Sequence, residues 1–264
     1  MTAFSIASLI GVVLFSFLGP VLYGIDPLFF NSGSILTPPS AEHWFGTDRL
    51  GRDLCARMME GGQVSLMIGF LSALISTLIG LLYGVSAALI RGGFDKLFIV
   101  IVDLFLTFPT LFLLLTLVSY VNASIWVLIV IISITGWMGT ARMIRSESFA
   151  ISSKPFIRIL RIAQIHPLRI IVKYYAPLLG PIVLVSFTFG VGGAILAESG
   201  LSFLGLGIVA PQMSWGSILS GGKEVIDIAW WVSFFPGLMI FIVTFSLMNL
   251  SNALQARWTQ KEVR

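Results

Sequence analysis

Six long apolar segments alternate with polar segments along this chain of 264 residues. A helix needs about 20 mostly apolar residues to cross a bilayer, and such helices satisfy their own backbone hydrogen bonds in lipid. The pattern therefore predicts an all-α membrane protein with six transmembrane helices. Their approximate ranges are 4–23, 64–90, 97–121, 124–141, 178–206 and 228–253.

Two of these segments carry further signals. The first has no basic residue before it and no clear small-residue cleavage site, which favours a retained span over a signal peptide. The fifth is rich in glycine, and we expect it to break near Gly200 and to end before Pro211. The predicted parts are a first span with an outer polar loop (1–63), a core (64–253) and a tail (254–264).

The composition supports a bilayer as the solvent. Charged residues make up 11% of the chain and apolar residues 57%, whereas soluble domains carry about 25% charged residues. The single cysteine, Cys55, rules out an intrachain disulfide, and the isolated His43 and His166 cannot form a metal cage. The chain has no GxxxxGK[ST] phosphate loop. We therefore expect no ATP binding, no cofactor and no enzymatic activity.

The basic residues predict the orientation. With the N-terminus in the cytosol and six spans, 12 of the 16 lysines and arginines lie in cytosolic segments. Cytosolic loops carry an excess of Lys and Arg, so both termini are expected in the cytosol. The polar segment before the second span then lies outside, and the basic loop 142–177 lies inside.

The outer polar segment contains three arginines and two aspartates in HWFGTDRLGRDLCARMMEGGQ, residues 43–63. The spacing of Leu50, Leu54 and Arg57 predicts a short amphipathic helix from Asp48 to Glu60. Thr47 or Asp48 can cap this helix. Two interpretations stay open here. The segment is either an interfacial helix whose Arg and Asp side chains pair with one another, or a platform that contacts another protein or gates a pore mouth.

Two acidic residues lie within apolar spans. Asp103 either faces a protein interior or a water-filled path, or its side chain reaches the cytosolic interface. Pro109, six residues later, should kink the same helix. Glu198 precedes glycines at 200, 205 and 207, and we expect it to accept hydrogen bonds from free amides and hold a helix break. A proton relay is the alternative role for Glu198.

The cytosolic loop 142–177 combines apolar and basic positions with helical spacing. Phe156, Ile159, Leu160 and Ala163 fall on one face, and His166-Pro167 ends this pattern before a second apolar run reaches Pro177. The pattern predicts two short helices at the membrane surface. They are either an interfacial hairpin held by anionic lipid or a docking element for a soluble partner.

Three motifs resemble one protein family. FGTDRLGRD at 45–53, AILAESGLSFLGLG at 194–207 and SWGSIL at 214–219 are similar in order and spacing to "C"-type permease subunits of bacterial ABC importers for dipeptides, oligopeptides or nickel. The resemblance implies one N-terminal span followed by the five-helix core of a type I importer. It assigns an outer-face motif to Gly46, Thr47, Asp48, Gly51, Arg52 and Asp53. It assigns a core helix-break motif to Glu198, Gly200, Ser202, Phe203, Gly205, Gly207, Trp215 and Gly216.

The resemblance also implies the partners and location. These are a second homologous permease, one or two cytosolic ATPase subunits, an extracytoplasmic substrate-binding protein and the bacterial inner-membrane bilayer, with no nucleic acid. Short peptides are the first expected substrate, and nickel or a metal chelate is the second. Two functions of other classes remain as alternatives: a proton-coupled carrier using Asp103 and Glu198, and a non-transporting membrane scaffold.

The chain departs from the family in the cytosolic loop. Counting back from Pro177, the family's Glu-Ala-Ala positions of the ATPase-coupling motif fall on Arg158, Ile159 and Leu160, and its glycine position falls on Gln164. Of this motif only Pro177 is kept. The departure raises the hypothesis of a diverged ATPase partner or weak coupling.

Overall fold

The computed structural model describes residues 2–262, and within them the regular structure is helical with no β-strand. The N-terminal part contains α1 (Thr2–Phe17), α2 (Gly19–Tyr23) and a short 3-10 turn η1 (Ser32–Ser34). The remaining elements are α3 (Leu54–Ile90), α4 (Gly92–Thr107), α5 (Thr110–Ser119), α6 (Ile125–Ser153), α7 (Pro155–Ile162), α8 (Pro167–Ile170), the π turn η2 (Ile171–Tyr175), α9 (Ala176–Phe203), α10 (Trp215–Gly222), the 3-10 turn η3 (Lys223–Val225) and α11 (Trp231–Glu262). The prediction of an all-α protein is confirmed.

Among residues 2–262, four helices are long and apolar enough to span a membrane, and a bent helix pair brings the number to five if it counts as one span. The bent pair is α4 and α5, which meet at an angle of 85°. The expected kink at Pro109 is therefore confirmed, because this residue lies directly between the two helices. The remaining expected span, the first one at 4–23, corresponds to α1 and α2. The 16 residues of α1 give about 24 Å of helix, less than the roughly 30 Å hydrocarbon core, so the count of six stays a prediction.

Several predicted boundaries move. α3 begins at Leu54 rather than near residue 64, so it continues across the expected division at 63–64. α11 likewise continues through 253–254 into the expected tail. The break expected near Gly200 is wrong, since α9 passes through this residue and ends at Phe203. A single glycine in a packed helix weakens it by about 1 kcal/mol, which surrounding contacts offset.

The helices pack around α3, which lies against both α6 and α9. Close approach of α3 and α6 depends on two glycines one turn apart. A Cβ added at Gly84 would lie 2.8 Å from the carbonyl oxygen of Ala141, and one added at Gly80 would lie 3.0 Å from its nitrogen. Small residues let helix backbones approach in this way inside membranes. α9 in turn packs against α11, which covers α1.

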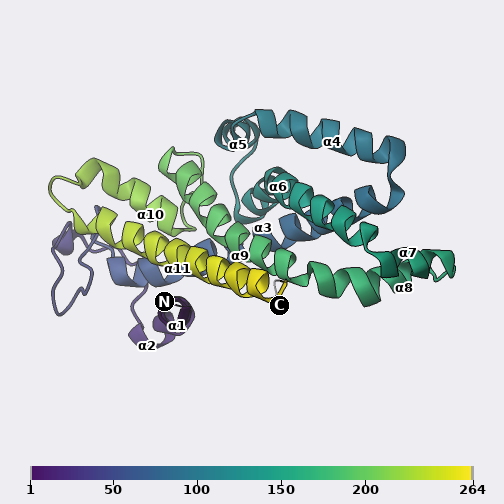
Figure 1. Ribbon diagram of the computed structural model, residues 1–264. Coiled ribbons are helices and arrows are strands. Elements are labelled where there is room, and N and C mark those ends of the chain that lie inside the picture. The colour runs from purple at the N-terminus through teal and green to yellow at the C-terminus, as the bar shows by residue number, and fades with distance from the viewer. Residues whose placement is uncertain (1, 263–264) are drawn as a thin grey trace.

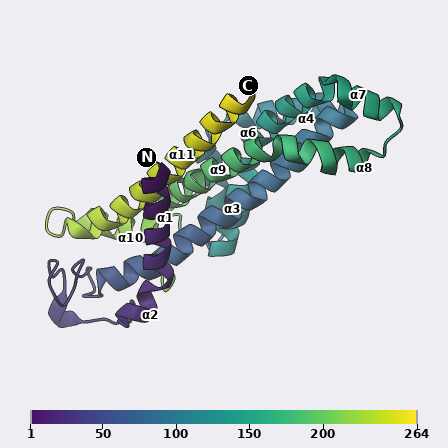
Figure 2. The same cartoon turned by 60° about the horizontal axis from the view of Figure 1, so that its bottom comes forward.

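The polar segment and the basic loop lie at opposite ends of the helix bundle. In both Figure 1 and Figure 2 the loop after α2 and the end of α10 gather at one end, while α7 and α8 project from the other. This arrangement agrees with the sequence-based expectation that the two segments face opposite sides of a membrane.

Candidate functional site

The outer-face motif is a tight turn and not the start of a helix. The expected amphipathic helix from Asp48 is wrong in its boundary, because α3 begins at Leu54 with Asp53 as its N-cap. The Asp53 carboxylate accepts a hydrogen bond from the Ala56 amide at 2.8 Å. Neither Thr47 nor Asp48 caps the helix, since the chain between them and Leu54 is folded into the turn.

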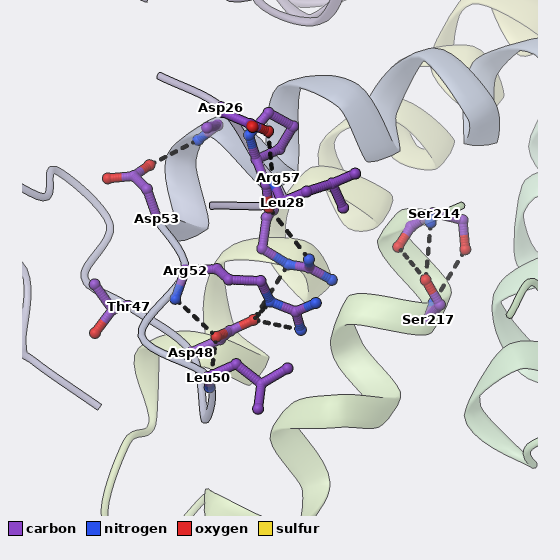
Figure 3. A network of polar contacts seen from close by, with 12 residues as sticks. Asp26, Leu28, Thr47, Asp48, Leu50, Arg52, Asp53, Arg57, Ser214 and Ser217 are labelled. Atoms are coloured by element: carbon purple, nitrogen blue, oxygen red, sulfur yellow. Dashed lines mark hydrogen bonds and ion pairs between the residues drawn. The ribbon is translucent and has the colours of Figure 1, made fainter. Parts of the chain in front are cut away.

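Asp48 organises this turn through contacts of both its carboxylate oxygens (Figure 3). One carboxylate oxygen accepts from the Leu50 amide at 2.8 Å and the Arg52 amide at 3.0 Å. The other lies 2.8 Å from Arg52 Nε and 3.3 Å from Arg57 Nε. The Arg and Asp side chains of the segment therefore pair with one another, as the first of the two open interpretations supposed. Since Asp48 is only 6% exposed, water competes little for these contacts.

Thr47 and Gly46 anchor the turn to the bundle. The Thr47 hydroxyl accepts from the Thr37 amide at 2.8 Å and donates to the Ser34 carbonyl. The Thr47 carbonyl accepts from the Trp231 indole N–H of α11 at 3.1 Å. Gly46 adopts a φ of +76°, and a Cβ there would lie 2.7 Å from the Thr37 carbonyl oxygen. The turn is thereby fixed to both the preceding loop and α11.

Asp53 also joins three segments of the chain. Its Oδ2 accepts from the Tyr23 hydroxyl of α2 at 3.2 Å and lies 2.8 Å from Nδ1 of His43. Nothing in the sequence placed Tyr23 and His43 beside this carboxylate, because α2 and the loop reach it only through the tertiary fold.

A hollow of about 400 Å³ opens between this turn and α10. Its polar wall includes Arg49, Arg52, Arg57 and Asp48, while Ser217 belongs to the opposite wall. Arg49 also forms an ion pair with Glu224 just beyond α10. With three guanidinium groups against one carboxylate in its wall, the hollow favours an anionic contact.

The helix-break motif forms a buried polar cluster around Glu198. This side chain is fully buried, and its Oε1 accepts hydrogen bonds from Ser202 Oγ and Ser214 Oγ, both at 2.6 Å. The expectation that Glu198 accepts from free amides is therefore wrong: its partners are serine hydroxyls on α9 and at the start of α10. Ser214 is the N-cap of α10 in a capping box with Ser217, so Glu198 fixes where α10 begins.

The neighbouring motif residues hold α10 against α9 and α3 through hydrogen bonds and close packing. The Trp215 amide donates to Ser65 Oγ at 3.0 Å, and its indole N–H donates to the Met58 carbonyl at 2.9 Å. A Cβ at Gly216 would lie 2.6 Å from the Cα of Ser199, and one at Gly207 would lie 2.4 Å from the Cα of Ser202. These two glycines allow the chain to fold back against α9.

The other members of this motif, Gly205, Gly200 and Phe203, are less tightly packed than Gly207 and Gly216. Gly205 takes the left-handed φ of +83° in the turn that ends α9. Gly200 has room for a Cβ, with Leu111 at 4.0 Å as its nearest neighbour. Phe203 is 39% exposed, and Lys223 Nζ lies 5.2 Å from its ring centroid. Sequence reasoning missed Ser65 and Ser214, although the serine directly before Trp215 carries the usual N-cap signature.

The coupling-loop positions lie at the far end of the bundle. The two predicted short helices are confirmed as α7 and α8. Arg158 and Ile159 are exposed on α7, whereas Leu160 packs against a buried cluster that includes Ile157 and Tyr175. Pro177 is exposed near the start of α9. Gln164 has a φ of +54°, a backbone conformation that favours glycine.

Two ion pairs join α4 to α6 at the same end. Arg145 forms a bidentate pair with Asp95 at 2.6 and 2.8 Å. Asp103 pairs with Arg142, and its side chain is 53% exposed. Asp103 is therefore not enclosed in the interior of this subunit, and Arg142 is a partner that the sequence did not identify. Within residues 2–262, no group of three or more His, Cys, Asp or Glu residues could hold a metal ion.

Comparison with known proteins identifies the family. Residues 76–260 match the family described as the binding-protein-dependent transport system inner membrane component. The chain is 36% identical over 219 residues to the dipeptide transport system permease protein DppC of Bacillus subtilis, covering 83% of this chain and 68% of that protein. The chain belongs to this permease family. It is also 36% identical over 230 residues to the oligopeptide permease OppC of Mycobacterium tuberculosis strain H37Rv, covering 86% of this chain and 78% of that one.

The fold agrees with membership of the permease family. A chain of the MetNI methionine ABC transporter, in an inward-facing conformation, superposes with a TM-score of 0.58 at 19% identity and covers 75% of this chain and 96% of that chain. The protein is therefore a permease subunit of an ABC importer, and its apolar helices make it a multi-pass protein of the inner membrane. Members of this family work with an ATPase and a substrate-binding protein.

Proposed function

We propose that this permease carries short peptides, di- or oligopeptides, across the bacterial cytoplasmic membrane. The observation that carries the proposal is the 36% identity to DppC over most of this chain, a relative named for dipeptide transport. The oligopeptide permeases among the relatives support the same substrate class. The buried Glu198 and the pair Asp103–Arg142 have partners that fit structural roles.

The proposed assembly pairs this chain with a second homologous permease as a heterodimer. The cytosolic ATPase subunits, one or two kinds, contact α7 and α8 through the coupling loop, and both termini face the cytosol. The placement of the loop and the outer turn at opposite ends of the bundle supports this topology (Figure 2).

The substrate-binding protein docks, in this proposal, at the outer-face turn. Asp48 and Thr47 hold the turn rigid through buried hydrogen bonds, so it can serve as a fixed platform. The hollow lined by Arg49, Arg52 and Arg57 suits acidic side chains of the docking protein. Charge complementarity of this kind mainly raises the association rate and the specificity.

The permease itself supplies no covalent chemistry. ATP binding by the partner ATPase favours one of two helix arrangements, and the coupling loop transmits this preference to α6 and α9, which flank it. The free energy comes from differential stability of inward-open and outward-open states. Substrate released by the binding protein then enters the cavity of the outward-open state.

The assembly is tested by affinity purification of the tagged chain from its native membrane in mild detergent, followed by mass spectrometry. We expect recovery of a second permease and one or two ATPases, and uptake of radiolabelled trialanine that depends on ATP and is lost on deletion. Recovery of the chain alone, while a control importer stays intact, would favour the scaffold. Uptake that is unchanged by ATP depletion but is abolished by an uncoupler of the proton gradient would favour a proton-coupled carrier.

The coupling loop makes a separate prediction. The double variant Arg158→Glu/Gln164→Gly should increase stimulation of the ATPase by substrate-loaded binding protein. Glycine removes the left-handed backbone strain at position 164, which is roughly 1 kcal/mol and corresponds to about a fivefold change in an equilibrium. ATPase rates of the reconstituted complex measure the effect. Arg158→Glu/Gln164→Ala is the control, because alanine retains the Cβ; equal stimulation of all three proteins would contradict a docking role for these positions.

A further inference from the structure

A cavity of about 230 Å³ lies where α3, α5, α6 and α9 meet. Its fifteen lining residues are small or carry hydroxyl groups, apart from Leu114 and Ile132. Seven of them are serines or threonines, contributed by all four helices. These are Ser72, Ser76, Thr77, Thr110, Thr135, Thr140 and Ser186.

Three of the seven hydroxyls in this wall donate their protons to backbone carbonyls of the protein. Thr135 donates to the Ile131 carbonyl at 2.9 Å, Ser76 to the Ser133 carbonyl at 3.0 Å, and Ser72 to the Ile129 carbonyl at 3.4 Å. A hydroxyl oxygen that donates its proton still keeps lone pairs as acceptors. The wall therefore offers hydrogen-bond acceptors.

Ser186 differs from these hydroxyls. Its side chain belongs to α9 and lines the cavity, its exposed fraction is 8%, and its Oγ has no hydrogen-bond partner in the described chain. An unsatisfied buried polar group costs about 1–3 kcal/mol. A hydroxyl kept free at this position is poised to bind a polar group that enters the cavity.

The cavity carries no fixed charge. Among the described residues that line it, none is Asp, Glu, Lys or Arg, and none is His, Cys or Met. Ion pairing and the coordination of a soft or borderline metal are therefore not the chemistry of this wall. Each non-proline peptide unit carries one N–H donor, and a wall of neutral acceptors can bind such donors whatever the charge of the neighbouring side chains.

Two exposed glycines, one on α6 and one on α9, line the cavity. Gly136 and Gly193 are both exposed, and a Cβ built at Gly193 meets no atom within 4 Å. If the cavity opened toward the lipid chains, its hydroxyl groups would face a medium that offers them no hydrogen bonds, which is unfavourable. The open side therefore suits a covering partner subunit or a water-filled path.

We propose that this hydroxyl-lined cavity is the subunit's half of the substrate path, and that it binds backbone N–H groups of a peptide without discriminating the charge of its side chains. The inference rests on the proposed peptide-import function. It adds the residues of the path and the chemical basis of the contact, with Ser186 as the hydroxyl available to the substrate.

A blocking variant tests the position of the path. Gly193→Trp places an indole in the cavity without an initial backbone clash and should lower trialanine uptake by roughly tenfold or more, since the cavity is smaller than a usual ligand pocket. Gly180→Trp is the matched control, because Gly180 is also on α9, is exposed and has no atom within 4 Å of an added Cβ. It lies outside the cavity lining. Near-normal uptake by a Gly193→Trp complex that retains its partners would overturn the proposal.

Cysteine labelling tests the lining without relying on transport. Ser186→Cys should react with a cationic and an anionic methanethiosulfonate at similar rates, because a charged wall would separate the rates by about tenfold or more. Wild-type protein is the blank, since Cys55 is fully buried. Ser148→Cys is the matched control: Ser148 is also buried without a hydrogen-bond partner in the described chain, but it does not line the cavity.

The labelling outcomes separate this inference from the proposed function. Protection of Ser186→Cys from both reagents, with and without ATP, overturns the inference. The inference is also overturned if Ser186→Cys reacts much faster with one of the two charged reagents than with the other. Labelling of Ser148→Cys at the same rate as Ser186→Cys would overturn it as well. Failure of wild-type protein to import any peptide overturns the peptide assignment, and the labelling result then still decides whether the cavity is an uncharged, water-accessible path.

Discussion

Replacing Gly51 with alanine is expected to destabilise the outer-face turn more than any other single methyl addition in it. Gly51 has a φ of +68°, and an added Cβ would lie 1.8 Å from the carbonyl oxygen of Asn31 and 2.8 Å from its carbonyl carbon. Both are backbone atoms, so no rotamer change relieves the clash and the turn must open. The contacts that Asp48 makes to Leu50 and Arg52 would then be lost.

The expected loss is at least about 3 kcal/mol, the upper part of the usual range for single mutations. For a chain of this size it lowers the thermal unfolding midpoint by roughly 6–12 °C, measured on the detergent-solubilised complex. Gly24→Ala is the matched control, because Gly24 has a φ of +66° and no atom within 4 Å of an added Cβ. This control should cost only the left-handed strain, about 1–2 kcal/mol. Equal losses in both variants would show that backbone strain alone, and not the contact with Asn31, explains the glycine.

Removing the carboxylate of Glu198 is the second large perturbation. Glu198→Ala leaves the hydroxyls of Ser202 and Ser214 without their acceptor, and each buried unsatisfied group costs about 1–3 kcal/mol. The substitution also opens a cavity in a fully buried site. Because Ser214 caps α10, we expect that helix to loosen as well, for a total of about 3–5 kcal/mol.

Glu198→Gln and Glu224→Ala calibrate this result. Glutamine keeps a carbonyl oxygen for the two serines and should cost less than half as much as alanine. Glu224 is 70% exposed in its ion pair with Arg49, and loss of such a surface pair usually costs no more than about 1 kcal/mol. Unfolding midpoints of the three purified complexes provide the measurement. Similar losses for Glu198→Ala and Glu198→Gln would mean that loss of the carboxylate charge, and not loss of the acceptor for the two serines, sets the stability of this site.

Local sequence patterns identified features that depend on near neighbours in the chain. Apolar segments of sufficient length indicated the helical membrane architecture, and Pro109 marked the bend between α4 and α5. The helical spacing before His166 indicated α7, and α8 follows it. The family motifs identified the permease. Each inference works because helix formation, proline geometry and lipid solvation act on residues within a few turns of one another.

Local patterns were misleading where distant contacts compete. Leu50, Leu54 and Arg57 have helical spacing, yet residues 48–53 form a turn because Asp48 bonds to its own neighbours and Gly51 packs against Asn31. Gly200 does not break α9, because the end of this helix is held by Glu198, Ser202 and Ser214 across the fold. In both places side-chain contacts outweigh the intrinsic preference of the backbone.

The sequence by itself thus determined the solvent of this protein, its helical class, its family and the ends of the bundle on which the polar segments lie. Tertiary structure alone brought Trp215 to Ser65, 150 residues away, gathered hydroxyls from four helices around one cavity and paired Arg145 with Asp95. The physical reason is that these contacts depend on how whole helices rotate and cross, and a periodic pattern gives the apolar face of a helix without giving the partner it meets.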